Sequence, residues 1–305
     1  MKNIFKKLHL FLFNPDVRFI QLAGRGFFNH WPDEKYLKRK FKAFLGYELN
    51  LKNPQTFSEK LQWLKLYDRN PLYTTLVDKY AVKKWAADTI GQQYIIPTLG
   101  VWNSFDEIDF DKLPNQFVLK TTHDSGGVAI CRDKTHFDKQ AACKKLTRSL
   151  KHNYYYSGRE WPYKNVPHKI IAEAFIGNNT QKDITDYKFF CFNAQPAYCQ
   201  VITDRTTQEK VDFFDMQWQH QPFTGLQKPF PHAKIHPSRP ACFDQMKQAC
   251  ALLAKNIPFA RVDFYEVNQK MYFGEITFFP ASGFGTFTPD TWNKAMGDRV
   301  KLPIK

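Results

Sequence analysis

The sequence lacks the long apolar runs by which membrane-spanning proteins are recognised. No apolar run is long enough to cross a bilayer. The apolar start at residues 1–14 is interrupted by charges, and no small-residue cleavage site follows it. We therefore expect a cytoplasmic protein, with a peripheral position at the inner face of the membrane as the alternative.

Paired cysteines and common nucleotide loops are missing as well. The six cysteines include no C-x-x-C pair and no zinc-like spacing. In a chain of this size without a signal peptide we expect buried reduced thiols rather than disulfides. No G-K-[ST] Walker sequence occurs, and no G-x-G-x-x-G sequence opens a helix. A nucleotide site in this chain therefore belongs to another class.

Acidic residues are few, with 29 Asp and Glu against 44 Lys and Arg, and the formal net charge is +15. This excess indicates an anionic partner, and charge alone does not choose among nucleotide phosphates, an acidic polysaccharide, nucleic acid and an anionic membrane. The basic residues are dispersed and accompany no recognition motif, so we expect no nucleic-acid partner. The 29 Phe and 14 Tyr argue against a disordered chain.

The first 75 residues are basic and aromatic. Apolar residues at helical spacing predict an amphipathic helix over Asp33–Leu45, and Thr56 or Ser58 is the expected N-cap of a second helix. The charges of these helices fit a solvated face. The alternative is that the first forty residues contact an anionic membrane or a lipid-linked glycan.

A predicted strand at Phe117–Lys120 leads into a turn of small residues. Consecutive amides at Ser125, Gly126 and Gly127 would make a concave anion site, to which Lys120 adds a point charge. The alternative is an ordinary glycine-containing hairpin.

The middle of the chain alternates predicted helices, loops and strands. The loop at 154–167 offers Arg159, Trp161 and Lys164 as substrate contacts, with plain lid packing as the alternative. The remaining predicted elements are a helix starting near Asp78, a helix at 136–152, strands at 169–176, 186–193 and 197–203 with a turn at Gln195-Pro196, and a helix at 241–255.

The most informative stretch is a predicted β-hairpin with its turn at residues 268–270. Arg261 and Asp263 leave the first strand on one face, as Glu275 and Thr277 do on the second. Pairing the strands would bring two carboxylates beside a fixed cation, which suits Mg2+ held together with substrate phosphates. A solvated outer face is the alternative, but the apolar residues around both carboxylates favour burial with a partner.

Six motifs in a fixed order carry a family resemblance: D-K-x-x-x-K, F-V-L-K with its glycine turn, I-I-A-E-A-F-I, D-Y-K, R-V-D-F and G-E-I-T. In this order they resemble the ATP-grasp fold, and most closely the TupA-like branch of teichuronopeptide-biosynthesis proteins found in bacterial surface-polysaccharide gene sets. The F-S-E-K-L-Q-W-L-K-L-Y-D, R-E-W-P-Y-K and G-D-R-V-K-L-P stretches are similar to that branch too. The resemblance covers about residues 57–303.

The resemblance implies an α+β fold with two lobes that hold a nucleotide between them. We expect a basic, mostly helical region at 1–75, an N-lobe with a glycine flap at 76–172, and a C-lobe with the metal site at 173–305. ATP would be the co-substrate and Mg2+ the metal cofactor.

The resemblance also implies roles for individual residues in binding the nucleotide. Lys120 would contact the nucleotide phosphates beneath a mobile flap made of Ser125, Gly126 and Gly127. The residues that would hold adenine and ribose are Glu173, Ala174, Phe175, Ile176 and Asp186.

The catalytic and metal residues follow in the same way. Lys188 matches the phosphate-side strand, and Arg261 would stabilise charge on the transferred phosphoryl group or on the intermediate. Asp263 and Glu275 would bind Mg2+. Many ATP-grasp ligases have Asn two residues after the metal-binding Glu, where this chain has Thr277, a weaker ligand. This departure argues against the usual geometry of a second Mg2+ ion, and it leaves the binding of the first ion unaffected.

These expectations predict an ATP-dependent carboxylate–amine ligase that works through an acylphosphate. It would attach an amino acid or amine to a uronic-acid-containing surface glycan, or build a short peptide on one. The partners would be a nucleotide, an anionic or lipid-linked glycan, and an amine. One alternative is a glycosyltransferase of the same pathway that holds a nucleotide-sugar. The other is a non-enzymatic basic module that binds membrane or nucleic acid.

Overall fold

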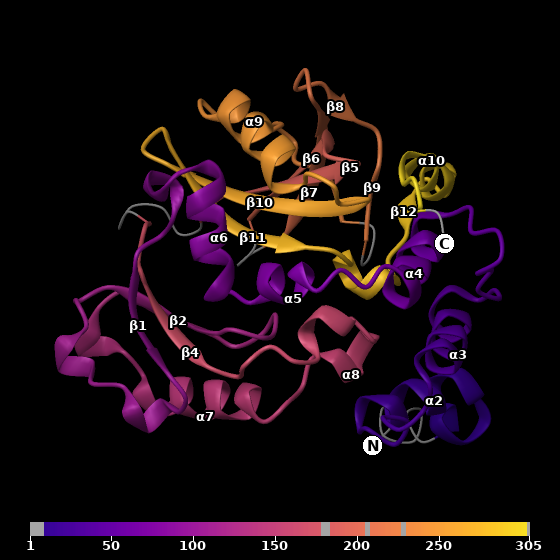
Figure 1. The fold of residues 1–305 in the computed structure, drawn as a ribbon, viewed down its shortest axis with the longest axis horizontal. Coiled ribbons are helices and arrows are strands. Elements are labelled where there is room, and N and C mark those ends of the chain that lie inside the picture. The colour runs from indigo at the N-terminus through magenta and orange to yellow at the C-terminus, as the bar shows by residue number, and fades with distance from the viewer. Residues whose placement is uncertain (1–8, 178–183, 205–207, 227–229, 304–305) are drawn as a thin grey trace.

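Two antiparallel sheets organise the molecule (Figure 1). The computed structural model describes residues 9–177, 184–204, 208–226 and 230–303. The four-stranded sheet has the order β1-β4-β2-β3, with β1 Thr98–Trp102, β2 Phe117–Thr121, β3 Val128–Cys131 and β4 Ile170–Ala174. The six-stranded sheet has the order β11-β10-β5-β6-β7-β8, with β5 Asp186–Phe192, β6 Gln195–Thr203, β7 Lys210–Asp215, β8 His220–Gln221, β10 Phe259–Val267 and β11 Lys270–Thr277. A separate two-stranded pair joins β9 Thr224–Gly225 to β12 Phe287–Thr288.

Helices cover the sheets and form the N-terminal region. The α-helices are α2 Pro15–Gly24, α3 Asp33–Leu45, α4 Phe57–Tyr67, α5 Leu72–Val77, α6 Ala81–Ile90, α7 Lys139–Leu150, α8 Tyr155–Gly158, α9 Phe243–Leu253 and α10 Thr291–Arg299. The short 3-10 helices are η1 Gln92–Tyr94, η2 Phe105–Glu107, η3 Phe110–Lys112, η4 Lys134–His136, η5 Trp161–Tyr163 and η6 Pro280–Gly283. None of the helices in the described ranges is both long and apolar enough to cross a membrane.

The two N-terminal helices predicted from periodicity are confirmed. Helix α3 has the predicted bounds, and it ends at Gly46, which adopts φ 81 as a left-handed C-cap. Helix α4 begins after Thr56, whose side chain accepts from the amide of Glu59, while Glu59 accepts from the amide of Thr56 in return. This reciprocal capping explains why the helix starts where it does.

The carboxylate hairpin forms as predicted from its sequence. Its turn is at Asn268 and Gln269, which have φ values of 52 and 59, a backbone conformation that Asn tolerates and that suits a tight hairpin. Strand β10 lies between β11 and β5, so that Asp263 is paired with Glu275 on one side and with Lys188 on the other. The three side chains therefore come from adjacent strands at one level of the sheet.

The structure differs from the predicted elements at several element ends and in one predicted loop. Residues Gln195 and Pro196 lie inside β6, and the preceding turn is at Asn193 and Ala194 with φ 50 and 69. The helix expected from Asp78 begins at Ala81 instead. The loop at 154–167 contains the short helices α8 and η5. All six cysteines are free thiols, as expected.

The N-terminal helices share a hydrophobic core with the larger sheet. Phe57 of α4 packs against Phe259 of β10 with ring centroids 4.9 Å apart. On another side of this sheet, Phe243 of α9 packs against Phe189 of β5, with centroids 5.7 Å apart. The smaller sheet has a core of its own, in which Leu146 of α7 is buried. The boundary at residue 75 stays a prediction.

Candidate active site

A cavity of about 590 Å³ lies between strands of the larger sheet, the turn between β2 and β3 of the smaller sheet, and the loops around them. Its lining from the larger sheet includes Lys188, Arg261, Glu275 and Thr277. The turn between β2 and β3 contributes Asp124 and Ser125, and Lys79 precedes α6. A third wall is made by Tyr154, Glu160, Tyr163 and Ser282. The cavity is therefore lined mainly by charged and polar groups.

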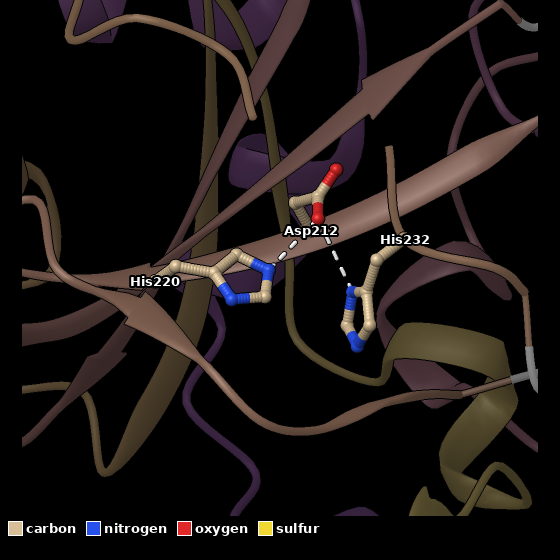
Figure 2. Close-up of side chains that lie close together, drawn as sticks. All are labelled: Asp212, His220 and His232. Carbon is tan, nitrogen blue, oxygen red and sulfur yellow. Dashed lines mark hydrogen bonds and ion pairs between the residues drawn. The ribbon is translucent and has the colours of Figure 1, made fainter. Parts of the chain in front are cut away.

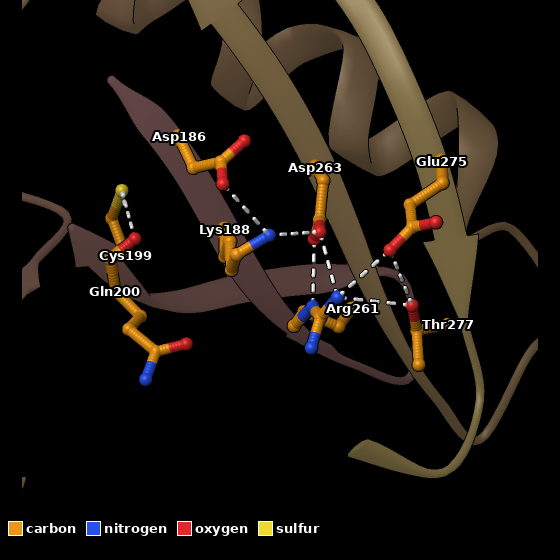
Figure 3. Close-up of polar contacts among 8 residues, drawn as sticks. All are labelled: Asp186, Lys188, Cys199, Gln200, Arg261, Asp263, Glu275 and Thr277. Carbon is orange, nitrogen blue, oxygen red and sulfur yellow. Dashed lines mark hydrogen bonds and ion pairs between the residues drawn. The ribbon is translucent and has the colours of Figure 1, made fainter. Parts of the chain in front are cut away.

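Arg261 connects the residues of the hairpin (Figure 3). Its Nε donates to Oδ1 of Asp263 and its Nη2 donates to Oδ2, both at 2.7 Å. The same Nη2 lies 3.1 Å from Oε1 of Glu275 and 3.1 Å from the hydroxyl of Thr277. Such a two-point contact fixes the guanidinium plane, which a lysine would not do.

Asp263 is held by two cations. Besides the contact with Arg261, one of its oxygens lies 2.5 Å from Nζ of Lys188, which also lies 3.6 Å from Asp186. Burial acts to raise the pKa of Asp263, but Arg261 and Lys188 outweigh it and hold that pKa below its usual range. Burial likewise acts to lower the pKa of Arg261, and Asp263 raises it above its ordinary value. The pair is therefore ionised at neutral pH.

The donor set at the cavity floor fits a hard cation. Asp263 and Glu275 occupy directly paired positions, and the hydroxyl of Thr277 lies 3.5 Å from Glu275. Both oxygens of Asp263 are engaged by Arg261 and Lys188, so the oxygen donors that face the cavity are those of Glu275 and Thr277, a kind of donor that Mg2+ prefers. The side chain of Glu275 is 40% exposed and lines the cavity, whereas that of Asp263 is 2% exposed. Glu275 is thus the more accessible carboxylate for an ion in the cavity.

The lysine predicted to contact phosphates is paired with a predicted adenine-site residue. Nζ of Lys120 lies 2.5 Å from one oxygen of Glu173, and Nζ of Lys83 lies 2.5 Å from the other. Burial acts to raise the pKa of Glu173, but Lys120 and Lys83 hold it below its usual range. We did not single out Lys83 from the sequence, although it is the last residue of the D-K-x-x-x-K motif.

The glycine turn is shaped by Asp124. Oδ1 of Asp124 accepts from the amide of Gly127 at 3.2 Å and from the hydroxyl of Thr121 at 2.5 Å. A Cβ on Gly127 would lie 1.9 Å from that hydroxyl, so the close approach requires glycine. The amide of Gly127 is therefore engaged within the turn, and the exposed Ser125 and Gly126 form its tip.

The segment expected to hold adenine spans the end of β4, with Glu173 and Ala174 in the strand. The amide of Ala174 donates to the carbonyl of Pro97 at 3.0 Å. The ring of Phe175 lies under the guanidinium of Arg132, 5.1 Å from its centroid. Ile176 follows as partly buried coil. The adenine-binding role of Glu173, Ala174, Phe175 and Ile176 and the ribose-binding role of Asp186 stay predictions.

The loop at 154–167 lines the cavity through residues that the sequence did not single out. The hydroxyl of Ser282 donates to Glu160 at 2.5 Å, and burial raises the pKa of Glu160. Of the residues named from sequence, Arg159 is 1% exposed and donates to the carbonyl of Phe28 at 2.7 Å. The indole N–H of Trp161 donates to the backbone carbonyl of Asp68 at 3.1 Å. The structure therefore assigns Arg159 and Trp161 to packing.

Comparison with known proteins adds family membership to this geometry. Residues 59–301 match the family described as TupA-like ATPgrasp. No curated protein matches the chain. Among solved structures, the chain is similar to D-alanine-D-alanine ligase from Helicobacter pylori, with 13% identity, a TM-score of 0.43, and coverage of 82% of this chain and 70% of that one. It is also similar to the ATP-grasp ligase PsnB complexed with minimal precursor, Mg and ADP, with 10% identity, a TM-score of 0.41, and coverage of 92% and 75%. The match to the family model shows that the chain belongs to this family.

Proposed function

Because the chain belongs to the TupA-like ATP-grasp family, we propose that it is an ATP-dependent carboxylate–amine ligase that acts on a bacterial surface polysaccharide. Its carboxylate substrate is a uronic acid of that polysaccharide, of capsule, O-antigen or teichuronic type. Its second substrate is an amino acid or another amine. The reaction joins the two through an amide bond.

One observation carries this proposal. On the floor of a cavity, Arg261 is fixed by Asp263 and contacts Glu275, and Lys188 stands beside them. A pair of fixed cations next to two carboxylates that suit Mg2+ is what the transfer of a phosphoryl group needs, because such transfer depends on positioning and on the neutralisation of charge.

The proposed reaction has two steps. A carboxylate oxygen of the glycan attacks the γ-phosphorus of ATP, the bond to the bridging oxygen breaks, and ADP leaves with the electron pair. The lone pair of the amine then attacks the acyl carbon of the acylphosphate. Inorganic phosphate leaves with the electrons of the acyl C–O bond, and a proton of the amine passes to solvent. No covalent bond to the protein is formed.

The chain's own residues orient the reactants and balance their charge. Arg261 and Lys188 face the transferred phosphoryl group from the cavity floor, and Lys120 meets the other nucleotide phosphates below the tip of Ser125 and Gly126. Asp263, Glu275 and Thr277 would hold Mg2+, which would supply positive charge to the phosphate oxygens.

The charge of the chain supports a glycan with carboxylates. A formal net charge of +15 raises the local concentration of a polyanion around the protein. The third wall of the cavity differs from this basic surface, because it carries an acidic residue, the buried Glu160, next to Ser282. This wall is the part of the cavity that suits an amine.

The proposal is tested by measuring ADP release from purified protein with Mg2+ and ATP. Release should require both a uronic-acid oligosaccharide and an amino acid, and the product should have the mass of the two joined by loss of water. Release that continues without the amine would contradict the ligase reaction. Thermal stabilisation by a nucleotide-sugar and not by ATP would favour the glycosyltransferase instead.

Two variants test the site itself. Asp263→Asn and Glu275→Gln should each lower the rate of ADP release by about 100-fold or more, because Asp263 fixes the guanidinium of Arg261 and Glu275 is the proposed Mg2+ ligand that faces the cavity. Asp298→Asn is the matched control, since this exposed carboxylate on α10 pairs with the lysine one turn away. Equal rates in all three variants would remove the site from consideration.

A further inference from the structure

A second group of metal-binding side chains lies at the edge of the larger sheet, apart from the carboxylate hairpin (Figure 2). Asp212 on β7 is completely buried. Nε2 of His220, on β8, lies 2.8 Å from its Oδ1, and Nδ1 of His232 lies 3.2 Å from the same oxygen. His236 adds a third ring, with its Nδ1 3.4 Å from that oxygen.

We propose that Asp212, His220 and His232 form a structural Zn2+ site that fastens the segment 230–236 to β7 and β8. The site lies outside the proposed catalytic residues, and no step of the ligase reaction depends on it.

The donor set and its spacing fit this ion. The donor atoms of Asp212, His220 and His232 all lie within 4.8 Å of one another. Zn2+ takes imidazole nitrogens at about 2.0–2.1 Å and carboxylate oxygens at about 2.0–2.2 Å in a tetrahedron, which separates neighbouring donors by roughly 3.3 Å. The rings of His220 and His232 are inclined by 82°, so they approach the common point from different directions. His236 stands outside this set as an outer partner, with its Nδ1 3.4 Å from Oδ1 of Asp212.

The second oxygen of the carboxylate is anchored by the backbone. Oδ2 of Asp212 accepts from the amide of Ala233 at 3.1 Å, which turns Oδ1 toward the three imidazoles. Metal-binding carboxylates are commonly oriented by such a bond to the oxygen that does not bind the ion. The alternative is a hydrogen-bonded network in which histidines alone compensate a buried carboxylate. The two arrangements differ in whether the protein binds Zn2+.

The position of the cluster connects it to the wall of the cavity. The segment containing His232 is already tied to β7, because the amide of Val211 donates to the carbonyl of Pro231 at 3.1 Å. Val211 and Phe230, which flank the cluster in sequence, both line the 590 Å³ cavity. A Zn2+ ion at Asp212 would therefore fix the part of the cavity wall that β7 supplies. In the sheet, β7 is separated from β10, which carries Arg261, by β5 and β6.

The proposal is tested with the full chain after treatment with a chelator. Titration with Zn2+ in a calorimeter should show one ion bound per chain, and an excess of Mg2+ should not displace it. His220→Gln and His232→Gln should each weaken Zn2+ binding by about 100-fold or more, since changes to outer-shell partners alone cost about 10- to 100-fold. His136→Gln is the matched control, because this exposed histidine also contacts an aspartate, at 2.8 Å, and should bind unchanged.

Two further measurements keep the test decisive. Co2+ in place of Zn2+ should give the visible absorption of a tetrahedral site in the wild type and lose it in both variants. His236→Gln, at the most exposed of the three histidines, should weaken Zn2+ binding by only about 10-fold, as for an outer partner. We avoid Asp212 as a test because its removal disturbs a completely buried position. Wild-type protein that binds no Zn2+, or folded His220 and His232 variants that bind it as the control does, would overturn the proposal.

Discussion

Lys120 and Glu173 lie on the neighbouring antiparallel strands β2 and β4, and their side chains form an ion pair of 2.5 Å in which the carboxylate also holds Lys83. The lysine predicted to contact the nucleotide phosphates thus has its position set by a carboxylate of the adjacent strand. The side chain of Glu173 is 7% exposed, so the pair is shielded from water and from salt.

Glu173→Gln should lower the free energy of unfolding by about 3 kcal/mol. Removing the carboxylate leaves two largely buried lysines without their counter-charge, and breaking a buried pair costs about 3–5 kcal/mol. We choose the lower value because Lys83 and Lys120 retain 12% and 20% exposure. Urea denaturation at pH 7 measures the change. Glu34→Gln is the control, because its ion pair with Lys38 is 48% exposed on both sides and should be worth less than about 0.5 kcal/mol.

Stability should fall as the pH falls below about 4, the ordinary range of carboxyl groups. Burial alone would raise the pKa of Glu173 and of Asp263, but their cationic neighbours hold both values below the ordinary range. The unfolded chain therefore takes up protons at a higher pH than the folded chain, and acid favours unfolding. The urea midpoint should drop between pH 5 and pH 3. The drop should be smaller in Glu173→Gln, and an identical drop would show that this carboxylate does not contribute.

Arg261→Lys should impair both stability and ADP release. A lysine keeps the charge but loses the two-point contact with Asp263, whose side chain is 2% exposed. We expect a loss of about 2 kcal/mol in the free energy of unfolding and a fall of about 100-fold in rate. Arg239→Lys should leave both unchanged, since Arg239 pairs with Asp244 at the exposed surface. Arg261→Lys with a wild-type rate would rule out a role for guanidinium geometry.

Glu275→Gln and Asp263→Asn should differ in what they change. The side chain of Glu275 is 40% exposed, so its neutralisation should raise the Mg2+ concentration needed for half-maximal activity with little effect on unfolding. Asp263 is buried between two cations, so its neutralisation should also destabilise the fold, by about 3 kcal/mol. Mg2+ titration of ADP release and urea denaturation of both variants provide the comparison. A loss of stability in Glu275→Gln as large as in Asp263→Asn would contradict the assignment of Glu275 as the accessible ligand.

Gly127→Ala should destabilise the protein by about 1–3 kcal/mol, because its Cβ would overlap the hydroxyl of Thr121. The neighbouring Gly126 offers a matched control. A Cβ there meets nothing within 4 Å, so Gly126→Ala should be neutral. Thermal unfolding of the two variants measures the difference. Equal melting temperatures would show that the turn relaxes around the added methyl group.

The parts of the structure that the sequence predicted are those specified by local patterns. Helix α3 follows from apolar spacing, and the hairpin follows from its two apolar strands and the polar turn that begins at Asn268. The register then places Asp263 opposite Glu275, because side chains two residues apart leave a strand on the same face.

Contacts between distant segments were not predicted. Lys83 of α6 pairs with Glu173 of β4, and Ser282 donates to Glu160 within the third wall of the cavity. Neither partner carries a signal in its own neighbourhood, because a buried ion pair looks in sequence like two ordinary surface residues. The histidines around Asp212 are likewise spread over a proline-rich stretch without regular spacing. The chemical roles of the predicted site residues stay predictions until the variants are measured.

The packing of α4 bears on how this protein can be divided or recombined. Phe57 inserts among aromatic rings of the larger sheet. The hydroxyl of Ser58 donates to the carbonyl of Gly285 at 2.7 Å, and the side-chain amide of Gln62 donates to the carbonyl of Gly283 at 2.7 Å. The helix thus supports the backbone that directly follows the carboxylate hairpin. A truncation at residue 75 would strip away that support, so fragments for expression and chimeras between homologues should be joined ahead of Thr56.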